Sequence, residues 1–92
     1  MRNIKSKPIE VPAAFEAAPD RNPQGTPLIF TAEQDYVILK HMRRMGVRGF
    51  VKIFQKTYRR GSYDTLRNRY NKIVDLGATC ENVMAMHKRG EL

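Results

Sequence analysis

The chain has 92 residues, which is enough for one small domain and excludes two separate hydrophobic cores. Its 17 Lys and Arg side chains outnumber 9 Asp and Glu, and the formal net charge of +8 at pH 7 favours a polyanionic partner. A single cysteine, Cys80, excludes an intramolecular disulfide, and no apolar run reaches the roughly 20 residues of a membrane span. A reduced intracellular protein is therefore expected.

Residues 1–27 are predicted to form a flexible tail. Proline removes a backbone donor and bars a helix, and every proline of the chain lies in this segment: Pro8, Pro12, Pro19, Pro23 and Pro27. The alternative is one helical turn over 13–18 that docks Phe15. Four bases and three acids give this tail a net charge of +1, whereas residues 40–72 carry eleven bases and one acid, a net charge of +10. The basic excess is therefore local.

Two helices are predicted over about 32–45 and about 48–58. Thr31, followed three residues later by Gln34, is a capping-box pattern that starts the first helix, and Gly46 ends it. Its apolar face consists of Val37 or Ile38, Leu39, Met42 and Met45. The second helix is expected to start near Arg48 and Gly49, so that Gly46 and Gly49 form the turn between the two helices. One side of this helix carries Phe50, Ile53, Phe54 and Thr57.

A third helix is predicted over about 63–75, with Ser62 as its cap and Gly77 as its stop. At 100° per residue, one apolar stripe contains Tyr63, Leu66, Tyr70, Ile73 and Val74. The opposite arc contains Asp64, Arg67, Asn68, Asn71, Lys72 and Asp75. Thr79 can cap a short fourth helix through Val83, Met84 and Met86 that ends before Lys88, and the alternative is an extension that frays.

Three short helices with a polar, cationic third helix match a helix-turn-helix layout. Phe30, Phe50 and Tyr70 stand 20 positions apart, and the sequence around them resembles a Myb/SANT-type repeat, in which three bulky aromatics at such intervals build the core. Phe30-Thr31-Ala32-Glu33-Gln34-Asp35 followed by Ile38-Leu39 resembles the family's opening Trp-Thr-x-Glu-Glu-Asp-x-x-Leu. Gly49-Phe50-Val51-Lys52-Ile53 resembles its middle Trp-x-x-Ile, and Leu66-Arg67-Asn68-Arg69-Tyr70-Asn71 resembles the end of its third helix.

The resemblance covers about residues 28–76, where Phe or Tyr replaces each family tryptophan. The stretch 62–70 together with the Phe-Thr opening is more similar to the Myb-like domain of the telomeric repressor-activator protein family, some members of which use it for protein contacts. Pattern and resemblance together predict an all-α fold: a three-helix bundle of Myb or homeodomain type over 28–76, a C-terminal extension over 77–92 with a short fourth helix, and a disordered tail over 1–27. The resemblance also implies that Arg69 pairs with Glu33 or Asp35, and that the protein is nuclear, with a role in transcription, chromatin or telomeres.

The resemblance further implies that the third helix enters the major groove of double-stranded DNA. Side-chain chemistry supports this placement, because Arg pairs bidentately with guanine and Asn with adenine. The candidate base-edge residues are Arg67, Asn68, Asn71, Lys72 and Asp64, of which Asp64 accepts from cytosine or satisfies the helix end. The candidate phosphate contacts are Arg48, Lys52, Lys56, Arg59 and Arg60, and the expected core aromatics are Phe30, Phe50 and Tyr70. A minor-groove arm formed by Arg2, Lys5 and Lys7 is the alternative to a solubilising tail.

The alternative function is a SANT-like protein-interaction module in a chromatin or telomere complex. An enzyme is not expected, because the sequence has no paired carboxylates, nucleotide-binding loop or triad-like set, and no cofactor or metal is expected at His41 or His87. A single three-helix unit buries on the order of 600–1,000 Å² on DNA. Selective binding therefore calls for a second Myb-like repeat, a homodimer or an arm in the minor groove. A chromatin protein is the other candidate partner.

Overall fold

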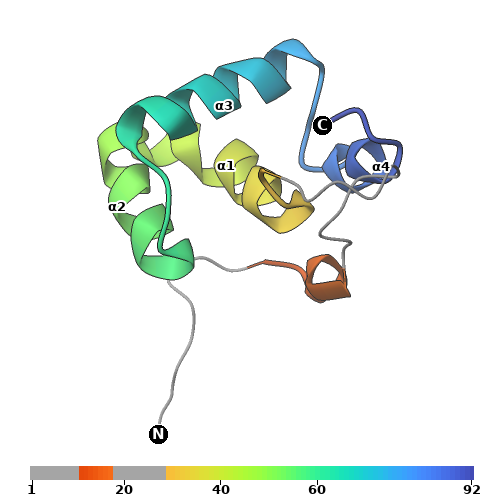
Figure 1. Cartoon of the computed structure of the whole chain (residues 1–92), viewed down its shortest axis with the longest axis horizontal. Coiled ribbons are helices and arrows are strands. Elements are labelled where there is room, and N and C mark those ends of the chain that lie inside the picture. The colour runs from red at the N-terminus through yellow and green to blue at the C-terminus, as the bar shows by residue number, and fades with distance from the viewer. Residues whose placement is uncertain (1–10, 18–28) are drawn as a thin grey trace, which may run out of the picture.

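The central element of the fold is α1 (Ala32–Met45), in a computed structural model that describes residues 11–17 and 29–92. The short 3-10 turn η1 (Ala13–Ala17) and the helices α2 (Val47–Tyr58), α3 (Tyr63–Asp75) and α4 (Val83–Lys88) all contact α1 (Figure 1). The described residues contain no strand, so the predicted all-α class is confirmed. None of their helices is long and apolar enough to cross a membrane.

The start of α1 is the predicted capping box. Thr31 Oγ1 accepts from the Gln34 amide, and Gln34 Oε1 accepts from the Thr31 amide, both at 3.1 Å. α1 ends at Met45 and is followed by Gly46, whose φ of 81° lies in the left-handed region that favours glycine. The expected role of Gly49 in this turn is wrong, because α2 already begins at Val47 and Gly49 lies in its first turn. One positive φ, at Gly46, suffices to redirect the chain.

The turn between α2 and α3 is built from Arg59, Arg60 and Gly61, which precede the predicted cap Ser62. Arg59 follows α2 with φ 58°, Gly61 has φ 97°, and Ser62 Oγ then accepts from the Thr65 amide at 3.2 Å to start α3. A Cβ on Gly61 would lie 3.1 Å from Phe54 Cδ1 and 3.2 Å from the Leu66 methyl groups. Glycine therefore serves this turn twice, through its backbone freedom and through its missing side chain.

The core collects fully buried side chains from all four α-helices: Val37, Ile38, Phe50, Phe54, Leu66, Ile73 and Val83. Phe30 is buried as well, and Tyr70 is partly buried against this core. Three residues expected on apolar faces are instead exposed, by 36% at Met45, 42% at Tyr63 and 44% at Val74. Met45 and Tyr63 are the terminal residues of their helices, where fewer neighbouring turns cover a side chain.

The predicted tail over 1–27 contains η1, which is the alternative docked turn. The Phe15 amide donates to the Pro12 carbonyl at 3.0 Å, and the Phe15 ring lies 4.7 Å from the Tyr36 ring, between centroids. Pro12 precedes the turn and therefore does not interrupt it. Within the turn, the Phe15 side chain is buried. The remainder of the tail prediction, including the proposed arm at Arg2, Lys5 and Lys7, lies outside the described residues.

The predicted fourth helix is present as α4, and it packs on α1 with Val83, Met86 and His87 buried. Thr79 does not cap α4 itself. It exchanges two hydrogen bonds with Asn82, one from the Asn82 amide to Thr79 Oγ1 at 3.2 Å and one from the Thr79 amide to Asn82 Oδ1 at 2.7 Å. These bonds close the turn immediately before α4, so the C-terminal extension is a folded part of the molecule.

Candidate nucleic-acid interface

The solvent-facing arc of α3 brings together the five candidate base-edge residues. Leu66 and Ile73 are fully buried on the inner side of the helix. The opposite side is exposed, and it carries Asp64, Arg67, Asn68, Asn71 and Lys72. Since successive residues turn by about 100°, these five positions share one arc. We call this set the α3 arc.

The α3 arc has a formal net charge of only +1. Arg67 and Lys72 are offset by Asp64 on the arc and by Asp75, which is also exposed, at the end of the helix. Arg67 NH2 lies 3.8 Å from Asp64 Oδ1, and their side chains are 50% and 81% exposed. An ion pair this exposed contributes little and exchanges readily for other partners. The arc offers hydrogen-bonding groups more than it offers positive charge.

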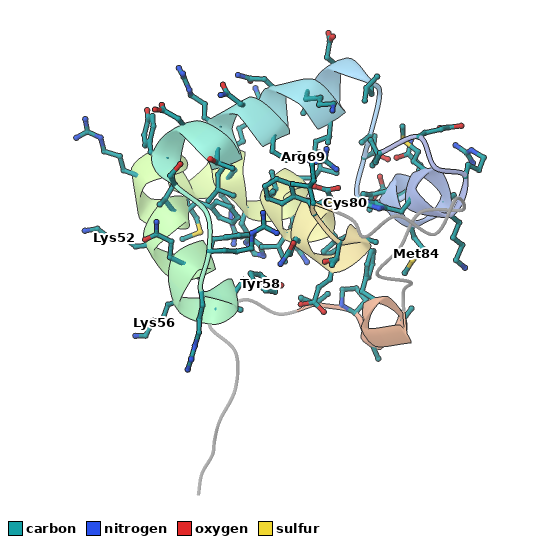
Figure 2. All side chains as sticks on the ribbon, viewed as in Figure 1. Lys52, Lys56, Tyr58, Arg69, Cys80 and Met84 are labelled. Carbon is teal, nitrogen blue, oxygen red and sulfur yellow. The ribbon has the colours of Figure 1, made fainter. Side chains whose placement is uncertain are left out.

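The positive charge is concentrated before α3. Residues 40–62 contain eight bases and no acid: Lys40, Arg43, Arg44, Arg48, Lys52, Lys56, Arg59 and Arg60. Four of them recur every three or four residues along the exposed side of α2, opposite the buried Phe50 and Phe54, and form the α2 basic row: Arg48, Lys52, Lys56 and Arg59. Figure 2 shows Lys52 and Lys56 extending from α2 away from the other helices. The exposed bases of α1, Lys40, Arg43 and Arg44, are absent from the sequence-predicted site.

Arg60, a predicted phosphate contact, already has partners within the fold. Its guanidinium donates to the Ile29 carbonyl oxygen, and its Cζ lies 4.6 Å from the centroid of the Phe30 ring. Arg69 Cζ lies 5.1 Å from the same ring. Phe30 is therefore held by two cation–π contacts, and Arg60 contributes to the seating of this aromatic residue.

A buried cluster of charged and polar groups lies beneath α3. Arg69 Nε and NH2 donate to the two carboxylate oxygens of Asp35 at 2.8 and 2.5 Å, which is the pairing implied for Glu33 or Asp35. His87 Nε2 lies 2.5 Å from Asp35 Oδ2. The Asp35 side chain is 0% exposed. His87 was not found from the sequence, because it lies 52 residues from Asp35 and no local spacing connects them.

A second polar contact ties α2 to α1. The Tyr58 hydroxyl donates to Glu33 Oε2 at 2.6 Å. Burial, followed by this hydrogen bond, raises the pKa of Tyr58 above its usual range. The Tyr58 phenol therefore stays protonated and remains a donor to Glu33.

His41 is half-buried and lies on α1, not on the α3 arc. Burial, followed by the charges of Arg44 and Lys40, holds the pKa of His41 below its usual value of 6.5. Within residues 11–17 and 29–92, no group of three or more His, Cys, Asp or Glu side chains is placed to hold a metal ion.

Cys80 is half-buried, and its thiol is expected to react slowly with alkylating reagents. Burial, followed by the charge of Glu81, raises the pKa of Cys80 above its usual value of 9.0, so less thiolate exists at a given pH. We expect iodoacetamide to alkylate the folded chain more slowly than the urea-unfolded chain from about pH 7 to 9, as measured by mass spectrometry. Equal rates in the two states would contradict this assignment.

Comparisons of the chain with protein-family models, with curated proteins and with solved structures find no match.

Proposed function

We propose that this chain binds double-stranded DNA, with α3 in the major groove and the α2 basic row along the phosphate backbone. The proposal is carried by one observation. The α3 arc presents Arg67, Asn68, Asn71 and Lys72 on a single exposed side, next to a helix, α2, that has bases and no acid. The resemblance to Myb/SANT repeats supports the same placement, together with a nuclear role in transcription, chromatin or telomere maintenance.

The dimensions and chemistry of α3 suit a major groove. An α-helix with its side chains is about 10–12 Å across, and the groove is about 12 Å wide. Arg67 and Asn71 are four residues apart and point from successive turns in the same direction. A bidentate contact of Arg with guanine or of Asn with adenine discriminates against other bases by about 1–3 kcal/mol. The arc therefore supplies the groups needed to distinguish sequences.

Affinity and discrimination are divided between the two helices. Because the arc has little net charge, the sequence-independent attraction to phosphates comes from the α2 basic row. Engagement of its four bases with phosphates predicts that log Kd changes with log salt by a slope of about 3–4. Binding to any duplex should consequently persist when discrimination between duplexes is lost.

The proposal is tested by selecting duplexes from a randomised pool with the whole chain and measuring Kd for an enriched and a scrambled duplex. Arg67→Ala combined with Asn71→Ala is expected to reduce the ratio of the two Kd values at least about tenfold, because one bidentate contact is worth that much. Absence of an enriched site, with the same affinity in the double variant, would rule out sequence reading by α3.

Two lysine variants serve as matched controls. Lys52→Ala is expected to weaken binding to both duplexes about equally and to lower the salt slope by about 0.9. Lys88→Ala makes the same change in charge at an exposed side chain of α4, away from both proposed contact helices, and is expected to have a much smaller effect. Equal losses in the two variants would show that net charge alone controls binding.

The second candidate function is a protein-interaction module. It is favoured by exposed apolar side chains flanking the α3 arc, because Tyr63, Val74 and Leu76 are 42%, 44% and 49% exposed. The basic surface selects for an acidic peptide and against a basic histone tail. An acidic peptide bound by the chain, with no affinity for duplex DNA at low salt, would favour this function over the first.

A further inference from the structure

We propose that His87 is a positioning residue for α3, acting through Asp35 and Arg69. The three side chains come from three different helices, α4, α1 and α3, and meet at one carboxylate. Asp35 Oδ2 lies 2.5 Å from both His87 Nε2 and Arg69 NH2. The side chains of His87 and Arg69 are 2% and 10% exposed, so water competes little for these hydrogen bonds.

The geometry indicates that His87 restrains the orientation of the Asp35 carboxylate. Arg69 binds both oxygens of the carboxylate through a planar fork, which fixes their common plane. A carboxylate oxygen accepts, so His87 Nε2 is the donor, and it reaches Oδ2 from the side of α4. Donors from two helices therefore restrain the rotation of the Asp35 side chain, and with it the position of the Arg69 guanidinium.

Arg69 in turn relates the core to the α3 arc. It lies along the helix between Leu66 and Ile73, the two fully buried anchors of α3, and Figure 2 shows it between α3 and α1. Asn68, which directly precedes Arg69, and Asn71, two residues after it, belong to the arc. A rotation of α3 about its axis would move Arg69 away from Asp35 and would redirect the arc by the same angle. Fixing Arg69 therefore fixes the direction in which the arc points.

The C-terminal extension thereby becomes part of the binding unit. This consequence rests on the proposed function, because it concerns the direction of groups that would meet bases. The docking of α4 does not depend on His87 alone, since Val83 and Met86 are also buried against the core. The two contributions of His87, its packing and its N–H, are separable by substitution.

The test compares His87→Gln, whose amide keeps a donor at about the distance of Nε2, with His87→Leu, which keeps similar volume and has none. The readout is the Arg69 Nε–H signal in ¹H–¹⁵N NMR spectra of the full chain, assigned by its disappearance in Arg69→Lys. We expect its exchange with water to be slow in the wild type and in His87→Gln, and roughly tenfold faster in His87→Leu. A residue that only packs would leave Arg69 protected in His87→Leu.

A DNA measurement separates this inference from the proposed function. The ratio of Kd values for enriched and scrambled duplexes is expected to fall about tenfold in His87→Leu and to be kept in His87→Gln, with affinity for the scrambled duplex unchanged. If the wild type does not discriminate between duplexes, sequence reading by α3 fails, and the Arg69 signal alone decides the role of His87. The inference is overturned if Arg69 is as protected in His87→Leu as in the wild type. It is also overturned if a folded His87→Gln loses this protection. Where His87→Leu does not fold, His87→Gln decides the outcome.

Discussion

Replacing Asp35 with alanine is expected to lower the free energy of unfolding by about 3–5 kcal/mol, since removal of one partner from a buried ion pair leaves the other charge uncompensated. The Asp35 side chain is 0% exposed and accepts both donors of the Arg69 fork. His87 loses its partner in the same substitution. A small domain has about 5–15 kcal/mol of stability in total, so this loss is a large fraction of it.

Urea unfolding followed by circular dichroism measures this loss. Asp64→Ala removes the same group from an 81% exposed side chain, and it is expected to change stability by less than about 0.5 kcal/mol. A further variant that replaces both Asp35 and Arg69 with leucine tests the origin of the effect, because an apolar pair of suitable shape removes the stranded charge. Similar midpoints for Asp35→Ala and Asp64→Ala would contradict a buried network.

Replacing Phe50 with alanine is expected to cost about 3–5 kcal/mol, through lost burial and the cavity that remains. Phe50 is fully buried, and its ring centroid lies 5.7 Å from that of Phe54. The urea midpoint should fall while the dependence of stability on urea stays close to that of the wild type. The matched control is Tyr63→Ala, an aromatic truncation at a side chain that is 42% exposed. A loss no larger than in this control would show that Phe50 is not a central core residue.

Features encoded in a few neighbouring residues were predictable from the sequence. The bounds of α1 and α3 were found because Thr31 with Gln34, and Ser62 with Thr65, satisfy helix ends within three residues. The grouping of the α3 arc was found for a similar reason, since 3.6 residues per turn fix which side chains share a side. The role of this arc at DNA stays a prediction.

Contacts between residues distant in the sequence were not predictable from local patterns, and the pair of Arg69 with Asp35 was expected only from the family resemblance. Phe15 is buried against the ring of Tyr36, and no local sequence pattern predicts this contact. The partner of His87 lies on another helix. The distribution of charge was predicted in part, because the basic stretch was located from the sequence. In the folded chain, however, Arg69 is neutralised by its pairing with Asp35. The cation–π contact of Arg60 with Phe30 was also not evident from the sequence.

The turn at Gly61 also bears on how this protein is able to evolve. Its φ of 97° is one barrier to any other residue, and the 3.1 Å approach of an added Cβ to Phe54 is another. Because the barriers have different origins, a compensating change in the core removes the second and leaves the first. Substitutions of the exposed side chains of α2 and α3 therefore leave this turn intact and change only what those side chains contact, whereas the course of the chain between the two helices is inherited together with the glycine.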